Sequence, residues 1–96
     1  MTDLRKQARG RECQVRLPCC NGNPETTVLA HLRMAGITGM SQKAPDVLGA
    51  WACSSCHDAV DRRDHKDLDL DFVRLAFFEG MARTIDKLVK EGRIKW

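Results

Sequence analysis

Cysteines and a histidine stand close together at spacings that suit a metal site. The segment WACSSCHDAVDRRDH (51–65) contains the C-x-x-C pair Cys53 and Cys56, and His57 follows directly. Two thiolates at this spacing can reach one tetrahedral ion from a single tight turn. If the segment is helical, Asp61 lies four residues beyond His57 on the same face. The segment therefore predicts metal chemistry with thiolate, imidazole and carboxylate ligands.

A second pair of cysteines is needed to close a four-thiolate site. Cys13 with either Cys19 or Cys20 can supply it, and Cys20 is preferred because it stands beside the turn-forming NGN. We predict a structural zinc ion on Cys13, Cys20, Cys53 and Cys56. The alternative is that the first three cysteines are small buried hydrophobic residues. Redox use of the C-x-x-C pair ranks lower, because the pattern lacks a βαβ context.

The histidines and a carboxylate predict a second, open site. His57 and Asp61, four residues apart, are suitable ligands for a divalent ion. His31 lies apart from them, in the strand-like stretch TVLAHLR. Two alternatives stay open: His57 replaces a cysteine in a Cys3His site, and Asp61 is a surface carboxylate. His65 is expected to be only a polar residue at the end of the helix.

The elements that must position these residues follow from hydrophobic periodicity and turn signals. QVRL (14–17) and TTVLAHLR (26–33) are strand-like, and the turn-rich CCNGNPE between them predicts a β-hairpin. Residues 34–49, with three glycines and a proline, predict a long loop.

Two short helices accompany the predicted hairpin. The N-terminal one is capped by Thr2 or Asp3 and ends near Gly10. The other covers SSCHDAVDRRDH and is capped by Ser54 or Ser55.

The C-terminal third predicts one long helix. Asp69 or Asp71 can cap it, and Gly92 can terminate it. Apolar residues recur at three- and four-residue spacing, which predicts a core-facing stripe. The stripe consists of Phe72, Leu75, Ala76, Met81, Ala82, Ile85, Leu88 and Val89. We assign this helix to packing and not to chemistry.

Length and composition bound the architecture. The 96 residues, 43% of them hydrophobic, indicate one domain over residues 1–96. Its parts are a basic N-terminal segment (1–12), a metal-binding core (13–65) and the C-terminal helix (66–96). A core of this size stabilises only marginally, so a bound metal would contribute a large share of the stability.

The positive charge is concentrated at the N-terminus. Residues 1–16 hold five basic and two acidic side chains, a net +3 that equals the charge of the whole chain. Such a segment suits phosphate groups, although solvated surface charge is the alternative. The predicted nucleic-acid contacts are Arg5, Lys6, Arg9, Arg11, Arg33, Arg62 and Arg63. Because no apolar run suits a membrane span or a secretion signal, we expect a cytoplasmic protein with reduced thiols.

Three stretches, LRKQARGRECQVRLP, CNGNPETTVLAH and ACSSCHDAVDRR, carry a resemblance to a known family. Together they resemble the small phage- and prophage-encoded "putative nucleases" of the YbcO type, and the likeness spans almost the whole chain. The order of AHL, a glycine-rich loop and CSSCH at the start of a helix is also similar to HNH, or ββα-metal, nucleases. The resemblance implies a small α+β fold of this HNH-like type, with a β-hairpin, a short metal-site helix and a long C-terminal packing helix.

The resemblance also implies roles for individual residues. His31 would be the general base, His57 would bind the catalytic ion, and Asp61 would be its second ligand. The ion would be Mg²⁺, Mn²⁺, Ni²⁺ or Zn²⁺, next to the structural zinc on the four cysteines. Two features depart from the HNH pattern: Ala30 occupies the place of a usual carboxylate ligand, and the central asparagine has no clear match. Asp46 is the candidate to replace either.

The expected function is a metal-dependent endonuclease that cleaves phosphodiester bonds, most directly those of DNA, alongside phage recombination or replication proteins. The alternative is a non-catalytic, zinc-stabilised module that binds nucleic acid or protein in the same processes, and Ala30 favours it.

Overall fold

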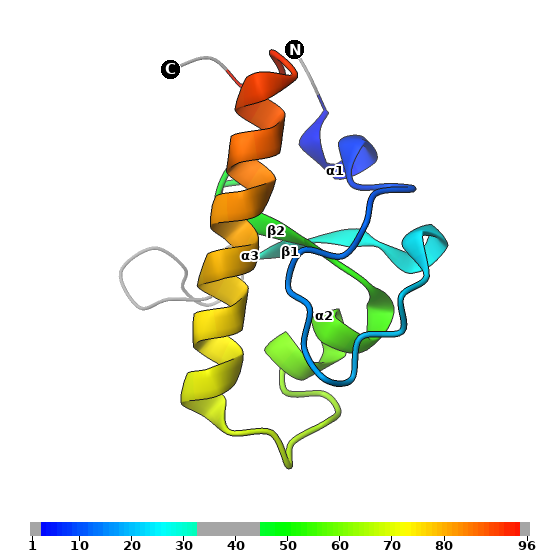
Figure 1. Ribbon diagram of the computed structural model, residues 1–96, viewed down its shortest axis with the longest axis vertical. Coiled ribbons are helices and arrows are strands. Elements are labelled where there is room, and N and C mark those ends of the chain that lie inside the picture. Colours follow the sequence, from blue (N-terminus) through cyan, green and yellow to red (C-terminus); the bar gives the residue numbers. More distant parts are fainter. Residues whose placement is uncertain (1–2, 33–44, 95–96) are drawn as a thin grey trace.

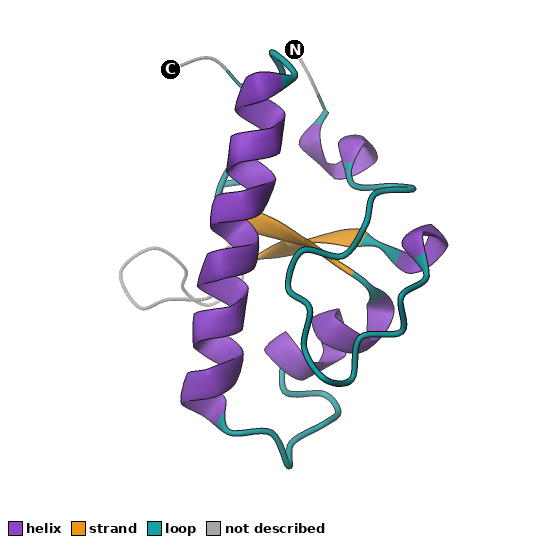
Figure 2. Ribbon diagram, in the orientation of Figure 1, coloured by secondary structure: helices purple, strands orange, loops and turns teal. Residues whose placement is uncertain are grey.

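The computed structural model describes residues 3–32 and 45–94 as a small α+β protein. Its elements are α1 (Leu4–Gln7), a 3-10 turn η1 (Pro24–Thr26), β1 (Val28–His31), β2 (Gly49–Ala52), α2 (Ser54–Val60) and α3 (Leu70–Lys90). Figure 1 shows α3 running along the whole molecule, with α1 and α2 both to one side of it. The two strands cross between these helices (Figure 2). No helix within the described ranges is long and apolar enough to cross a membrane.

The two-stranded sheet is antiparallel, but its second strand is not the predicted one. β1 pairs with β2, in a register that runs from Val28↔Ala52 to His31↔Gly49. Residues 14–17 form no strand, so the hairpin predicted between QVRL and TTVLAHLR is wrong. The partner of β1 instead follows the long connection that begins after residue 32. Most of the loop predicted over 34–49 lies outside the described residues.

The segment 14–17 does contact the sheet at one point. The backbone N–H of Gln14 donates to the carbonyl oxygen of Trp51 at 2.7 Å, on the edge of β2 away from β1. Two residues later Arg16 has a φ of 58°, a left-handed conformation that ends any extended run. Strand-like residue types therefore cover the edge of β2 without adding a third strand.

The long helix is present, but it buries a different face from the one predicted. Asp69 caps α3 by accepting from the N–H of Phe72, and Gly92, at φ 75°, follows its end. The buried residues are Val73, Phe77, Gly80, Thr84 and Leu88. Of the predicted stripe only Leu88 is fully buried, whereas the Leu75 side chain is 59% exposed. The helix therefore has two apolar faces, and the core takes only one.

Gly80 helps to decide which face is buried. A Cβ at this position would lie 2.9 Å from the carbonyl oxygen of Gln14 and 3.0 Å from the Cα of Val15. The segment 14–15 therefore crosses α3 in direct contact with its backbone, which only glycine allows. The guanidinium of Arg83 donates to the Gln14 carbonyl and fixes the same crossing.

Thr84 links α3 to the same edge of β2. Its hydroxyl accepts from the backbone N–H of Trp51 at 3.0 Å and donates to the carbonyl oxygen of Gly80 at 2.8 Å. Both Thr84 and Trp51 are almost fully buried. The hydroxyl thus satisfies a backbone donor that has no strand partner.

Replacing Thr84 by valine keeps the shape of the side chain but leaves the Trp51 N–H unpaired. We expect a loss of about 1 to 3 kcal/mol in the free energy of unfolding, the cost of a buried unsatisfied donor. Denaturant titration of the metal-loaded protein measures it. Thr84→Ser, which retains the hydroxyl, should recover most of the loss. Equal destabilisation by the two variants would assign the effect to packing.

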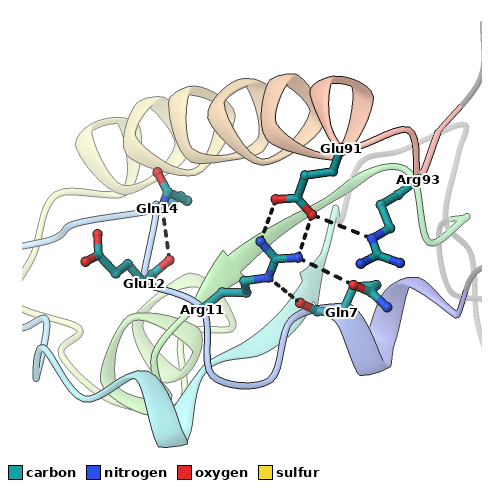
Figure 3. Close-up of polar contacts among 6 residues, drawn as sticks. All are labelled: Gln7, Arg11, Glu12, Gln14, Glu91 and Arg93. Carbon is teal, nitrogen blue, oxygen red and sulfur yellow. Dashed lines mark hydrogen bonds and ion pairs between the residues drawn. The ribbon is translucent and has the colours of Figure 1, made fainter.

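Charged groups join the N-terminal segment to the end of α3. Figure 3 shows the guanidinium of Arg11 between Gln7 and the carboxylate of Glu91. Both Arg11–Glu91 contacts measure 2.6 Å, and this pairing lowers the pKa of Glu91 below its ordinary value. The same guanidinium lies 4.6 Å above the ring of Trp51, in cation–π geometry. Trp51 packs in a cluster with Ala8, Leu29 and Leu88, away from the cysteines.

Candidate metal and catalytic site

Four cysteine sulfurs converge in one place. The Sγ atoms of Cys13, Cys20, Cys53 and Cys56 all lie within 4.8 Å of one another. The Cys20–Cys53 separation is 3.7 Å, and none of the cysteines is in a disulfide. A tetrahedral zinc with bonds of about 2.3 Å requires sulfurs about 3.8 Å apart. The group, hereafter the four-cysteine group, could therefore hold a metal ion, and its members are the four cysteines selected from the sequence.

The C-terminal half of the group is built by the start of α2. Cys53 is the N-cap of α2, and its Sγ accepts from the N–H of Cys56 at 3.5 Å. The cap is therefore Cys53 and not Ser54 or Ser55, because the chain leaves β2 in extended conformation and turns one residue earlier. Both sulfurs are buried by this turn.

Cys20, from the N-terminal half of the group, comes from a tight turn fixed to α2. The N–H of Cys20 donates to the carbonyl oxygen of Leu17 at 2.9 Å, which closes the turn. The amide of Asn21 then donates to the hydroxyl of Ser54 at 2.9 Å. Cys19 points elsewhere, with its Sγ 3.8 Å from the carbonyl oxygen of Ser55.

Neighbouring thiols and burial shift the pKa values of Cys13, Cys20 and Cys56. A hydrogen bond from Cys56 lowers the pKa of Cys13 to about 4, whereas the pKa of Cys56 is raised, chiefly by the same contact. Burial raises the pKa of Cys20 to about 11. Crowded thiols therefore do not all ionise on their own, and metal binding at this group must release protons.

His31 forms a pair with a carboxylate from the other side of the long connection. The Nε2 of His31 lies 2.7 Å from the Oδ1 of Asp46, and both side chains are partly exposed. The Nε of Arg5, on α1, lies 3.4 Å from the same carboxylate oxygen. The hydrogen bond from His31, followed by the charge of Arg5, lowers the pKa of Asp46 below its ordinary value.

A second histidine–carboxylate pair lies at the end of α2. The Nε2 of His57 is 3.2 Å from the Oδ2 of Asp61, whose side chain is only 6% exposed. Asp61 is the C-cap of α2, because the helix ends at Val60. Two ligand atoms of an octahedral ion with bonds of about 2.1 Å lie about 3 Å apart, so the pair fits the edge of such a site. Arg63 approaches the same oxygen at 3.6 Å.

The two histidine–carboxylate pairs are separate. In the described part of the chain, neither is joined by a third His, Cys, Asp or Glu ligand at metal-binding distance. Asp46 thus lies with His31 rather than with His57 and Asp61. His65 belongs to neither pair: it lies beyond α2 with a φ of 56°.

Ala30 stands at a core position. It is fully buried and pairs with Ala50 across the sheet. A carboxylate at this position would have no access to solvent or to an ion at the surface. The departure from the HNH pattern therefore reflects packing, and any additional acidic ligand must come from another segment.

The predicted nucleic-acid contacts fall into three groups. Arg11 and Arg62 have intramolecular partners: Arg11 binds Glu91, and Arg62 donates to the carbonyl oxygens of Lys66 and Leu68 in the loop after α2. Arg5, Lys6, Arg9 and Arg63 are exposed, and Arg5 and Arg63 each flank one histidine–carboxylate pair. Arg33 lies outside the described residues. The sequence does not predict that Arg5 contacts Asp46, because 41 residues separate the two.

Comparisons with known proteins identify one family over nearly the full length of the chain. The family model described as "Putative nuclease YbcO" matches residues 2–93. The chain is 56% identical, over 99% of both chains, to a protein of Escherichia coli (strain K12) with the same name. An equally similar relative, also named putative nuclease, comes from Enterobacteria phage 82.

A solved structure from Escherichia coli K-12 MG1655, titled as that of a "putative bacteriophage protein", has the same fold. It superposes with a TM-score of 0.79 and 52% sequence identity, over 94% of this chain and 100% of that one. Because the family model and the full-length relatives agree, the chain belongs to the family described as "Putative nuclease YbcO".

Proposed function

We propose that this protein is a metal-dependent endonuclease that hydrolyses phosphodiester bonds in DNA. The observation that carries the proposal is the contact of 2.7 Å between His31 and Asp46 at the partly exposed end of β1. A histidine oriented by a carboxylate is the arrangement that enzymes use for a general base. The name of the relatives, putative nuclease, supports the reaction class.

The pair defines how the proton would move. The ionised carboxylate of Asp46 can only accept, so the Nε2 of His31 carries the hydrogen that joins them. The Nδ1 atom is then the acceptor that takes a proton from the attacking water. Asp46 stays negative and stabilises the resulting imidazolium, and the exposed Arg5 adds a cation beside the approaching phosphate.

His57 and Asp61 would hold the catalytic ion. Their ligand atoms, 3.2 Å apart, can occupy neighbouring positions of one coordination shell. If these two residues held a divalent ion, it would supply Lewis-acid stabilisation of the charge that develops at the phosphate. Arg63 lies at the same end of α2, where it can contact the phosphate backbone together with Lys6 and Arg9.

The four-cysteine group would hold zinc with a structural role. Four sulfurs and no open position are the ligand set of structural zinc sites, whereas catalytic sites keep a position for water. Free thiols at this density suit a reducing compartment, so we place the protein in the cytoplasm. The phage relative supports a phage setting, and we propose that the protein acts there in recombination or replication.

One observation favours a second function, that of a non-catalytic binding module. The buried Ala30 removes the carboxylate that the HNH pattern expects next to its histidine. The protein would then use its basic residues to bind nucleic acid without cleaving it.

A plasmid-nicking assay separates the two functions. Zinc-loaded protein is freed of other ions and then supplied in turn with Mg²⁺, Mn²⁺ and Ni²⁺, while DNA binding is followed by gel shift. We expect nicking with at least one ion, and its loss in His57→Ala. In the matched control His65→Asn, a half-buried histidine of the loop after α2 is replaced by a residue that tolerates its positive φ, and nicking should persist. Binding without nicking under all three ions would favour the binding module.

A further inference from the structure

The outer face of α3 carries a second apolar stripe with a regular repeat. Its members follow one another at alternating steps of three and four residues. This is the a and d pattern of a heptad, the spacing of helices that pair in a coiled coil. The stripe consists of Leu75, Phe78, Ala82, Ile85 and Val89.

The stripe lies opposite the face that packs on the sheet. At about 100° per residue, its centre is roughly half a turn away from the buried row of Val73, Phe77, Thr84 and Leu88. Leu75 is 59% exposed and Phe78 41%, and Ala82 is exposed as well. Isolated exposed leucines are ordinary, but a periodic row over about two heptads, from Leu75 to Val89, marks an interaction surface.

We propose that this stripe is the interface of a parallel homodimer, in which α3 pairs with α3 of a second copy. A heptad stripe is self-complementary, so one surface serves both partners of a two-fold dimer. The stripe runs from Leu75 to Val89 within the 21-residue helix, or about 22 Å at about 1.5 Å per residue, which gives about two heptads of contact. The occupant is therefore another copy of this chain.

The charges beside the stripe favour the parallel orientation. With Leu75 at a heptad a position, Arg74 occupies the preceding g position and Glu79 the following e position. In a parallel pair these two side chains meet across the interface, once on each side of the axis. An antiparallel pair would instead bring the acidic e positions Glu79 and Asp86 to the same edge. Arg74 is exposed and has no ion-pair partner among the residues described, so it is available for this contact.

Among the residues described, the elements that contact α3 lie on its buried side. The sheet and α2 both pack against α3 from the other side, as Figure 1 shows for α2. The dimer would thus join two domains back to back through α3. This inference does not depend on nuclease activity, because assembly and cleavage are measured separately.

Light scattering after size exclusion tests the dimer on the full, zinc-loaded chain. We expect a mass of twice 10.8 kDa, falling to 10.8 kDa in Leu75→Glu. The matched control is Leu70→Glu: this leucine is 41% exposed, against 59% for Leu75, but lies at the start of α3, outside the stripe, so the dimer should persist. A wild-type monomer at high concentration, or a dimer that resists Leu75→Glu, would overturn the proposal.

A charge exchange tests the orientation. Arg74→Glu should weaken the dimer, and the double variant Arg74→Glu/Glu79→Arg should restore it, because a parallel pair brings these positions together. Weakening in the single variant without recovery in the double variant would refute the parallel arrangement. Circular dichroism of each variant confirms that any change in mass occurs between folded chains.

Discussion

Cys53→Ser is expected to abolish metal binding at the four-cysteine group and, with it, the cooperative fold. A structural zinc contributes an apparent binding free energy of about 10 to 16 kcal/mol at neutral pH. A domain of this size has a net stability of only about 5 to 15 kcal/mol. Loss of one of the four ligands therefore removes more stabilising free energy than the small hydrophobic core can supply. The measurements are zinc content by atomic emission and thermal unfolding by circular dichroism.

Serine is the informative replacement at this position because Cys53 has two roles. Its sulfur is part of the four-cysteine group, and it also caps α2 by accepting from the N–H of Cys56. Serine is among the best N-cap residues, so Cys53→Ser retains the cap while weakening the metal ligand. Any loss of stability is then attributable to the metal.

Cys19→Ser provides the matched control for this experiment. Cys19 neighbours Cys20 in sequence and lies close to α2, but its sulfur is not a member of the four-cysteine group. Its replacement should leave the zinc content at one ion per chain and shift the unfolding temperature only slightly. A Cys53→Ser protein that stays folded with a full complement of zinc would refute the structural role of the group.

The second large effect is expected for His31→Ala, which removes the proposed general base. Loss of a positioned base typically lowers the rate by about 10²- to 10⁴-fold. His31 is at the partly exposed end of β1, so truncation should cost little stability and leave the zinc content unchanged. The measurement is the rate of plasmid nicking at saturating divalent ion, with DNA affinity followed in parallel.

Asp46→Asn refines this test. The asparagine can still accept the hydrogen bond from the Nε2 of His31, but it cannot stabilise an imidazolium by charge. A smaller loss of rate than in His31→Ala is therefore expected, with DNA affinity nearly constant. If His31→Ala nicks DNA as fast as the wild type, His31 is not the base.

The pairing of strands shows one limit of local sequence patterns. Residues 14–17 have strand-like types, yet β1 pairs with a strand that follows a connection of about 17 residues. The choice between two strand partners is made by packing: Gln14 and Thr84 bond to β2 on its outer edge, and α3 covers it. Such contacts join residues tens of positions apart, and no local periodicity encodes them.

The choice of the buried face of α3 shows the same limit of local sequence patterns. Two apolar stripes run along α3, and the sequence predicts the wrong one for the core. Gly80 and Thr84 determine which face is buried. Gly80 permits the close crossing of residues 14–15, and Thr84 accepts a hydrogen bond from the backbone N–H of Trp51. Neither residue is hydrophobic, so a count of apolar positions overlooks both.

The sequence by itself determined what depends on short-range geometry. The C-x-x-C turn, the helix and Asp69 cap of α3, and the four-residue step from His57 to Asp61 all follow from bond lengths and helical rise within one or two turns. Only the tertiary structure decided which strand pairs with β1, which face of α3 is buried, and that Asp46 joins His31 and Arg5. These contacts join residues that are 15 to 69 positions apart in the sequence. Their free energy comes from packing of the whole chain, which the spacing of neighbouring residues does not reveal.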